Sequence, residues 1–329
     1  MRIWLQSSAF LPTPAPSTGG LEYIVASLGT QLAKRGHDVT LFALDGSHVP
    51  GVELVTVPHY KTPSATEIAI VDRMERRPKP DVLFDHSRWQ MAQTRWPSLP
   101  AVTMIHGNAS LEGHARNLVF CSLAHGHWHG VENPVALLNG IEPSDFVVGP
   151  PMASRHSALY MGRIMPYKRT HLAIDLCQRA GVPLTVAGPV TDSSYFGAYV
   201  RPRLQPEGHA HYVSEVAGAE RLRLLSESCC LVFTSEAQEP GAVTVIEAMA
   251  SGTPVFTFDH GSLPEFVADG VSGFLWRGEP EFETGLRLRA WESIDPAACR
   301  RHVEENLSTE AQATKAEAML AQAADGGTW

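Results

Sequence analysis

The chain alternates between short apolar runs and longer amphipathic segments. In the first half, "RIWLQSS", "HDVTLFAL", "VELVTVP", "DVLFDHS", "AVTMIHG" and "NLVFCS" have the apolar, β-rich character of strands. Between the first two lies "LEYIVASLGTQLAKRG", whose apolar positions fall on one helical face and which ends at Gly36, a typical helix-ending glycine. This alternation predicts a parallel sheet covered by helices, because parallel neighbours need a long crossover connection.

The second half repeats the pattern. Strands are predicted at "SALYMGRI", "PLTVAGP", "CCLVFTS" and "TPVFTFD", and helices at "THLAIDLCQRAG" and "GAERLRLLSES". A Gly/Pro-rich stretch over 147–155 separates the halves, and "STEAQATKAEAMLAQAA" predicts a last helix. We therefore expect two α/β domains, residues 1–150 and 151–308. A C-terminal helix and tail over 309–329 would pack back on the first domain, with the final "DGGTW" frayed.

Composition and charge favour a globular protein and argue against binding to nucleic acid. Hydrophobic residues make up 44% and charged residues 19%, which is ordinary for a globular protein, and the net charge of −9 argues against a nucleic-acid partner. The first residues are too short an apolar run for a signal peptide, and no run is long enough to span a bilayer. Five cysteines without metal-ligand spacing suit reduced thiols. We expect a cytoplasmic protein without an integral membrane segment.

Candidate binding residues follow the predicted strands. Ligands of doubly wound domains bind at the carboxyl ends of strands, so residues there are the first to consider. Gly19 and Gly20 precede the first helix, where backbone amides can face an anion, although glycine is also common there for steric reasons. Arg163 and Lys168 share one strand-to-helix loop. They would neutralise a diphosphate if they converge, or would simply be solvated if they do not.

The segment "EPGAVTVIEAMASGTPV" carries the most specific chemistry. Glu239 and Glu247 stand on either side of a predicted helix start, and the amides of Gly241, Ala242 and Val243 would form an anion site at that start. Each carboxylate can accept hydrogen bonds from a vicinal diol, which suits the ribose and the sugar of a sugar nucleotide. The plainer alternative is one glutamate favoured by the helix dipole and one solvated glutamate.

Over most of its length the chain resembles retaining glycosyltransferases of family 4, which have the GT-B fold of two Rossmann-like, doubly wound domains facing across a crevice. The resemblance rests on "LAKRGHDVTLF", "PDVLFDHS", "VTMIHG", "LLNGIEPSDF", "GRIMPYK" and, above all, "EPGAVTVIEAMASGTPVFTFDHGSLPEFVADGVSGFL" with its Glu-x7-Glu motif. It implies transfer of a hexose-type sugar from a nucleoside-diphosphate sugar to an acceptor hydroxyl, with no resident cofactor. No Asp-x-Asp is present to anchor a metal on a diphosphate, so we expect metal-independent transfer.

The resemblance also implies a role for each matching side chain. Glu239 would bind hydroxyls of the transferred sugar, and Glu247 those of the ribose. Arg163 and Lys168 would hold the diphosphate and stabilise charge on the leaving group. His106, directly after a strand, would lie near the reacting sugar; taken alone, a histidine there is more often structural.

Backbone groups complete the implied donor site. Gly20 would place its amide near the phosphates, the amides of Gly241, Ala242 and Val243 would reach phosphate and sugar, and Gly188 would approach the base and ribose. The chain departs from the family at Gly241-Ala242, where Phe-Gly is common, so aromatic packing under this loop is lost.

Two other functions remain open. A non-hydrolysing sugar-nucleotide epimerase would need acid and base carboxylates in the crevice, and a catalytically silent binding protein should have lost some of the four charged residues. The acceptor pocket is expected from "SAFLPTPAPST" and "DHSRWQMAQ" in the first half, where Trp89 would either stack on the acceptor or pack structurally.

Overall fold

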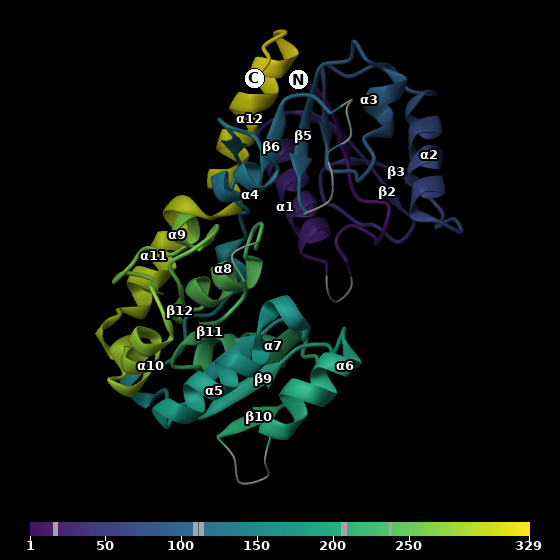
Figure 1. The fold of residues 1–329 in the computed structure, drawn as a ribbon. Coiled ribbons are helices and arrows are strands. Elements are labelled where there is room, and N and C mark those ends of the chain that lie inside the picture. The colour runs from purple at the N-terminus through teal and green to yellow at the C-terminus, as the bar shows by residue number, and fades with distance from the viewer. Residues whose placement is uncertain (16–18, 108–110, 112–114, 205–208, 237–238) are drawn as a thin grey trace. The chain divides into compact units, whose positions relative to one another are not determined.

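The computed structural model describes all residues except 16–18, 108–110, 112–114, 205–208 and 237–238 (Figure 1). Residues 16–18 belong to a loop that we expected at the acceptor pocket, and they lie outside the described residues. The chain divides into two compact units. Unit 1 comprises Met1–Ile141 and Thr309–Trp329, and unit 2 comprises Glu142–Ser308.

Unit 1 is a parallel sheet with helices on both faces. Its described strands are β1 (Arg2–Gln6), β2 (Asp38–Leu44), β3 (Glu53–Val57), β4 (Val82–Asp85), β5 (Ala101–Ile105), β6 (Leu118–Phe120) and β7 (Val135–Ala136). Its described helices are α1 (Gly20–Lys34), α2 (Pro63–Met74), α3 (Met91–Arg95), α4 (Leu123–Trp128) and α12 (Thr309–Ala324). The strand order is β3-β2-β1-β4-β5-β6-β7, and every pairing is parallel.

Alternation along β1 explains why unit 1 needs two layers of helices. Successive side chains of a strand point to opposite faces, so Ile3 and Leu5 join a core with α1 and α12, whereas Trp4 joins a core with α2 and α3. Figure 1 shows α2 and α3 on the side of this sheet away from α12. A strand that is buried on both faces is mainly apolar, as the central residues Ile3, Trp4 and Leu5 of β1 are.

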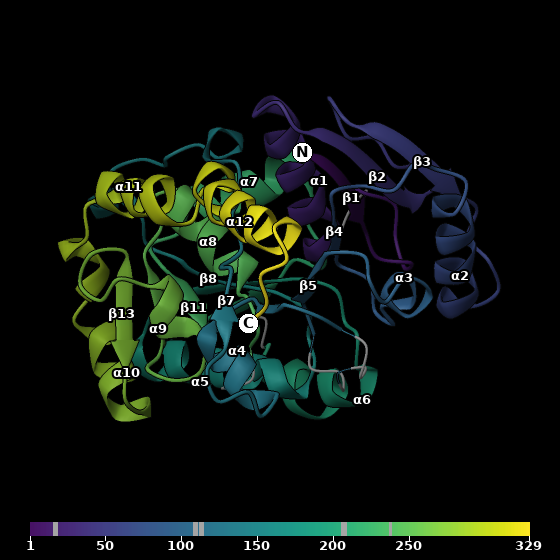
Figure 2. The ribbon, with the colours of Figure 1, turned by 90° about the horizontal axis from the view of Figure 1, so that it is seen from above.

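The C-terminal helix belongs to unit 1. α12 packs beside α1 (Figure 2), and its Ala313, Ala316 and Leu320 are buried in the shared core. The tail is not frayed as we expected. The indole of Trp329 donates to the carbonyl oxygen of Leu118 at 3.1 Å, and its backbone amide donates to the side chain of Asn117 at 3.2 Å. The terminal tryptophan is therefore held at the start of β6.

Unit 2 repeats the architecture. Its described strands are β8 (Ala158–Met161), β9 (Leu184–Ala187), β10 (Ala210–Tyr212), β11 (Leu231–Phe233), β12 (Val255–Phe258) and β13 (Gly273–Trp276). Its described helices are α5 (Thr170–Ala180), α6 (Ser193–Tyr195), α7 (Gly218–Glu227), α8 (Val243–Ala250), α9 (Leu263–Phe266), α10 (Glu279–Arg287) and α11 (Pro296–Asn306). α5 packs against α10, and α8 packs against α7 and α11. Gly181 ends α5 in the left-handed conformation, as its sequence predicted.

Both sheets reverse their strand order at one point. The order in unit 2 is β10-β9-β8-β11-β12-β13, so the chain moves outward first to one side of β8 and then to the other. The equivalent point in unit 1 lies between β1 and β4. Such a reversal leaves a crevice beyond the carboxyl ends of the two central strands, because their crossover connections leave in opposite directions. The topology therefore marks one candidate binding position in each unit.

Candidate functional site

In unit 2, Lys168 and Glu239 meet at the reversal of strand order. Lys168 ends the short 3₁₀ turn Pro166–Lys168 that follows β8, and Glu239 lies in the loop that follows β11. The ammonium of Lys168 forms an ion pair with Glu239, and Ser235 donates to the same carboxylate at 2.9 Å. Only 12% and 13% of the two side chains are exposed, so the pair is largely shielded from water.

Aromatic rings hold Lys168 in place. Its nitrogen lies 5.3 Å from the ring centre of Tyr167 and 5.4 Å from that of Phe233, distances at which a ring face attracts a cation. The guanidinium of Arg163 donates to the hydroxyl of Tyr167 at 2.9 Å and is exposed. The two predicted cations therefore both contact Tyr167, and among the described residues only Lys168 of the two is paired with a carboxylate. Arg169, which follows, lies 3.8 Å from Glu279.

Glu247 has a partner that the sequence did not reveal. It lies on the second turn of α8 and is buried, and Arg221 of α7 forms an ion pair with it. A buried carboxylate on an apolar helix requires a compensating cation, since its desolvation costs several kcal/mol. The sequence shows that Glu247 needs a partner but does not identify it, because Arg221 lies 26 positions away and no pattern between them pairs the two residues. The bond occupies one carboxylate oxygen, and the second oxygen can accept a further hydrogen bond.

The backbone groups that we expected at the donor lie at the start of α8 and directly after β9. α8 begins at Val243 with Ala242 as its N-cap, so Gly241 precedes the helix. Gly188 follows β9 with φ 140°, and an added Cβ would lie 2.0 Å from the carbonyl oxygen of Gly162. Its amide donates to Ser214 at 2.8 Å. Glycine is required at 188 by the close approach of two backbones, and its N–H is already engaged within the protein.

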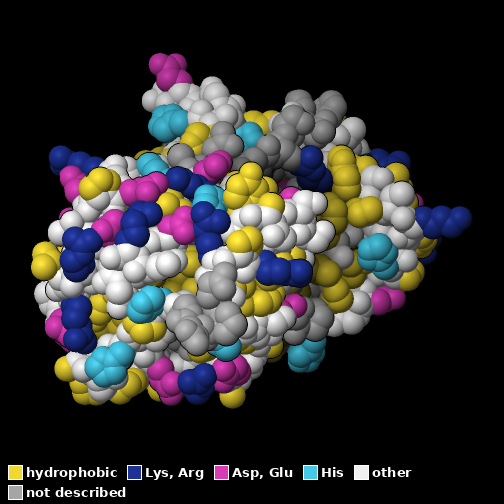
Figure 3. All heavy atoms as spheres, turned by 60° about the horizontal axis from the view of Figure 1, so that its bottom comes forward, with side chains coloured by type: hydrophobic (Ala, Val, Ile, Leu, Met, Phe, Trp, Pro, Cys, Tyr) yellow, Lys and Arg dark blue, Asp and Glu magenta, His cyan; other side chains and the backbone are white. Residues whose placement is uncertain are grey.

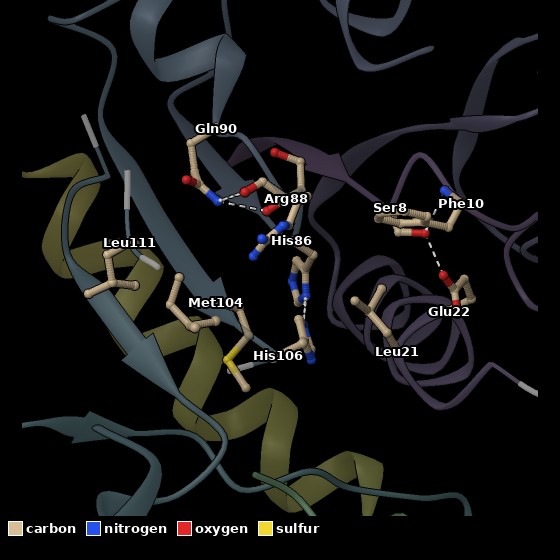
Figure 4. Close-up of a pocket in the computed structure, with 13 residues that line it drawn as sticks. Ser8, Phe10, Leu21, Glu22, His86, Arg88, Gln90, Met104, His106 and Leu111 are labelled. Carbon is tan, nitrogen blue, oxygen red and sulfur yellow. Dashed lines mark hydrogen bonds between the residues drawn. The ribbon is translucent and has the colours of Figure 1, made fainter. Parts of the chain in front are cut away.

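Unit 1 has a cavity of about 290 Å³ at its own reversal of strand order (Figure 4). Its polar lining comes from the loops after β1 and β4, from the start of α1 and from the end of β5. Glu22, on the first turn of α1, is buried and accepts a hydrogen bond from the hydroxyl of Ser8. Gly20 opens α1. An added Cβ on Gly19 would lie 2.3 Å from that of Ala15, so steric need explains the first glycine of this pair.

His106 lines this cavity together with a second histidine, His86, whose ring it contacts. Its Nε2 lies 2.8 Å from Nδ1 of His86, and both residues line the cavity (Figure 4). Burial, and secondarily the nearby His125, lowers the pKa of His106 to about 3, and burial followed by the nearby His106 lowers the pKa of His86 well below its usual value. Both rings are neutral near pH 7, so they offer hydrogen bonds and no charge. Sequence reasoning missed His86, although its position directly after a strand is the same signal that singled out His106.

A buried carboxylate organises the loop after β4. Glu67 of α2 is fully buried and accepts hydrogen bonds from the hydroxyl of Ser87 and from the backbone amides of Trp89 and Met91, at 3.0 to 3.2 Å. Burial, and then the neighbouring Asp85, raises the pKa of Glu67 to about 7. Trp89 itself stacks on Phe10 at 5.9 Å between ring centres.

The rest of the described chain adds no metal cluster or membrane span. No group of three or more His, Cys, Asp or Glu residues within it is arranged to hold a metal ion, and none of its helices is long and apolar enough to cross a membrane. All five cysteines are buried free thiols. Basic and acidic side chains are intermingled over the described part of the face drawn in Figure 3, which matches the many ion pairs of unit 2.

Family models match each half of the chain separately. Residues 18–138 match the model "Glycosyltransferase Family 4", and residues 151–283 match "Glycosyl transferases group 1". Glycogen synthase of Mycobacterium tuberculosis is 26% identical over 92% of this chain and 88% of its own length. D-inositol 3-phosphate glycosyltransferase of Mycolicibacterium smegmatis is 29% identical over 49% of this chain and 38% of its own length.

Solved structures agree with the fold over the whole chain. AviGT4, a glycosyltransferase involved in avilamycin A biosynthesis, superposes with a TM-score of 0.77 at 23% identity, covering 100% of this chain and 99% of its own. HepE of Anabaena, in complex with UDP and glucose, superposes with a TM-score of 0.72 at 18% identity over 98% and 99%. The fold is therefore GT-B, as we predicted. The chain belongs to the group 1 glycosyltransferases of the family 4 type.

Proposed function

We propose that this glycosyltransferase moves a hexose-type sugar from a nucleoside-diphosphate sugar to an acceptor hydroxyl, with retention and without a metal ion. The observation that carries the proposal is the shielded pair of Lys168 and Glu239 at the strand-order reversal of unit 2. A cation beside a carboxylate at that position matches a phosphate beside a sugar hydroxyl. The structural neighbour HepE, with UDP and glucose, supports this class of donor.

In the proposed reaction the charged side chains of unit 2 act on the donor. Lys168 and Arg163 stabilise the charge that develops on the diphosphate as the glycosidic bond breaks. Glu239 accepts hydrogen bonds from the transferred sugar, and the second oxygen of Glu247 accepts from the ribose. The departing phosphate oxygen takes the proton of the acceptor hydroxyl, which attacks from the same face. His106, as a neutral ring, orients a hydroxyl of the reacting sugar.

The first test is calorimetric binding in EDTA. UDP, GDP, ADP, dTDP and their common sugar conjugates are titrated into wild type, Glu247→Gln, Glu239→Gln and the exposed control Glu236→Gln. We expect one nucleotide to bind wild type and the control equally, and Glu247→Gln to weaken it about tenfold, since a hydrogen bond to a charged group is worth about 1.5–3 kcal/mol. Glu239→Gln should lose chiefly the extra affinity of the sugar conjugate. Absence of nucleotide binding by wild type would overturn the proposal.

The second test follows the reaction by NMR. Retention appears as the same anomeric configuration in donor and product, and activity in EDTA shows that no metal is needed. Interconversion of the donor sugar without an acceptor would identify an epimerase instead. Tight donor binding with neither transfer nor hydrolysis, across a broad panel of acceptors, would identify a silent binding protein.

A further inference from the structure

Arg88 is a charged side chain in the unit 1 cavity to which the reaction described above assigns no role. It lies in the loop after β4, its side chain is exposed, and it lines the cavity (Figure 4). No ion pair joins it to any carboxylate of the described residues, whereas Arg77, elsewhere in the same unit, has one and Arg95 has two. A guanidinium presents a rigid fork of donors, which matches an oxyanion.

The protein holds this loop in one defined conformation. Gln90 has a left-handed backbone, with φ 48°, and its buried side chain donates to the carbonyl oxygens of Ser87 at 2.8 Å and Arg88 at 3.0 Å. Glu67 accepts three further hydrogen bonds from the same loop. A left-handed backbone at a residue other than glycine raises the energy of the folded state, and such strained residues concentrate at binding sites. The backbone around Arg88 is thus specified while its side chain projects outward.

The remaining groups of the cavity do not supply positive charge. His86 and His106 are neutral because burial lowers the pKa of both rings. Glu22 accepts from Ser8 and lies on a different side of the cavity from Arg88 (Figure 4). Apolar side chains, including Leu21 and Met104, form much of the remaining wall. Arg88 is therefore the group of this cavity that would bind an anion, and Glu22 and the histidines are the groups that would bind hydroxyls.

We propose that the acceptor is a small hydroxylated molecule that carries a phosphate or a carboxylate, and that Arg88 selects it through that anionic group. This inference rests on the proposed function, since it takes the unit 1 cavity as the acceptor site. The volume of about 290 Å³ lies at the lower end of the range of ligand pockets and suits a single ring better than a chain of sugars. The anion of the acceptor binds at Arg88, and a hydroxyl of the acceptor lies toward Glu22.

The test measures the accessibility of Arg88 to an arginine reagent, phenylglyoxal, by peptide mass spectrometry. Wild-type protein saturated with its nucleotide is treated with or without inorganic phosphate or acetate, so that anion binding at the donor site does not interfere. We expect phosphate or acetate to slow modification of Arg88 several-fold and to leave Arg76, exposed on the same unit outside the cavity, unchanged. The more protective anion distinguishes a phosphate acceptor from a carboxylate acceptor. Equal rates at Arg88 with and without both anions would overturn the inference.

A steady-state assay gives the second measurement. Glucose, glucuronate and glucose 6-phosphate form a matched neutral, carboxylate and phosphate series of acceptors. Arg88→Gln should raise KM for the preferred charged acceptor about tenfold or more, with little change in kcat, because the contact is uniform binding remote from the reacting hydroxyl. Arg76→Gln should match wild type. Preference of the wild type for the neutral sugar would count against the inference.

The nucleotide titration of the same samples separates the two proposals. If wild type binds no nucleotide, the proposed function fails. If it binds nucleotide and Arg88 is protected by neither anion, only the acceptor inference fails. Arg88→Gln should bind nucleotide as wild type does, which also shows that the variant is folded.

Discussion

The two units have the same strand-order reversal but present different polar groups at it. In unit 2 the position between β8 and β11 is occupied by charged partners, Lys168 with Glu239, and Arg221 with Glu247 lies on neighbouring helices. In unit 1 the position between β1 and β4 is lined by two neutral imidazoles, by Glu22, whose carboxylate accepts from a serine hydroxyl, and by the exposed Arg88. One topology thus supports a site of ion pairs in one unit and a site of hydrogen bonds in the other.

The comparison teaches that the fold decides where a ligand binds and the side chains decide which ligand it is. Crossover connections create the crevice in both units regardless of sequence. Phosphates require cations, so the charged site suits the nucleotide. Hydroxyl groups are best recognised by neutral donors and acceptors and by carboxylates, so the two histidines and Glu22 of unit 1 suit the hydroxyls of an acceptor, and Arg88 suits its proposed anionic group.

The largest effect is expected at Lys168. Lys168→Ala removes a cation aimed at the leaving group, and such groups are worth about 100-fold or more in kcat. Nucleoside diphosphate release at saturating donor measures the loss. Lys315→Ala, on the exposed side of α12, is the control and should match wild type. A Lys168→Ala enzyme with normal kcat would remove the contrast between the units.

A pH effect on stability is expected from Glu67. Its pKa is raised to about 7 from 4.5, so the folded state holds the proton more tightly than the unfolded state. The stabilisation is present below pH 4.5 and is lost as pH rises through 7, by about 3 kcal/mol in total. Urea unfolding at pH 4.5, 6 and 8 measures this slope. Glu67→Gln should flatten it, and Glu75→Gln at the exposed end of the same helix should not.

Arg221 should matter for stability in unit 2. Arg221→Leu leaves the buried carboxylate of Glu247 without its cation, which costs about 2 kcal/mol given that the arginine is partly exposed. Adding Glu247→Leu should restore part of the loss, because the uncompensated charge is gone. Arg223→Leu, exposed on the same helix, should cost less than about 1 kcal/mol. If the double variant is no more stable than Arg221→Leu, the ion pair is not the cause.

The smallest change is expected at His106. Because its pKa is lowered to about 3, its ring should stay neutral from pH 8 down to about pH 4. NMR of ring-labelled histidine would show constant shifts for His106 over that range in the native protein. In urea the same ring should titrate near 6.5, the value of an unburied histidine. A native His106 that titrates near 6.5 would mean that its ring becomes charged close to neutral pH, and the contrast between ion pairs in unit 2 and neutral imidazoles in unit 1 would lose its basis.

Local sequence patterns were sufficient to predict most helices and strands and the loops that carry Lys168 and Glu239. The apolar runs predicted the strands that precede Lys168 and Glu239, because burial of a strand leaves an apolar run in the residue order. Helical spacing predicted α1 and α5, and helix propensity predicted α12. Local patterns could not predict which side chains contact one another across the fold. Arg221 beside Glu247, and His86 beside His106, are juxtapositions of residues 20 or more positions apart, and residue order alone does not encode them.

By itself the sequence determined the two α/β repeats, the loops that carry charge, and the family they resemble, since each depends on residue order within short segments. Only the tertiary structure decided which charges pair, which imidazoles are neutral, and that Glu67 lies beneath the loop of Arg88. Burial and neighbouring charge set those properties, and both arise when strands distant in the chain are brought side by side in a sheet.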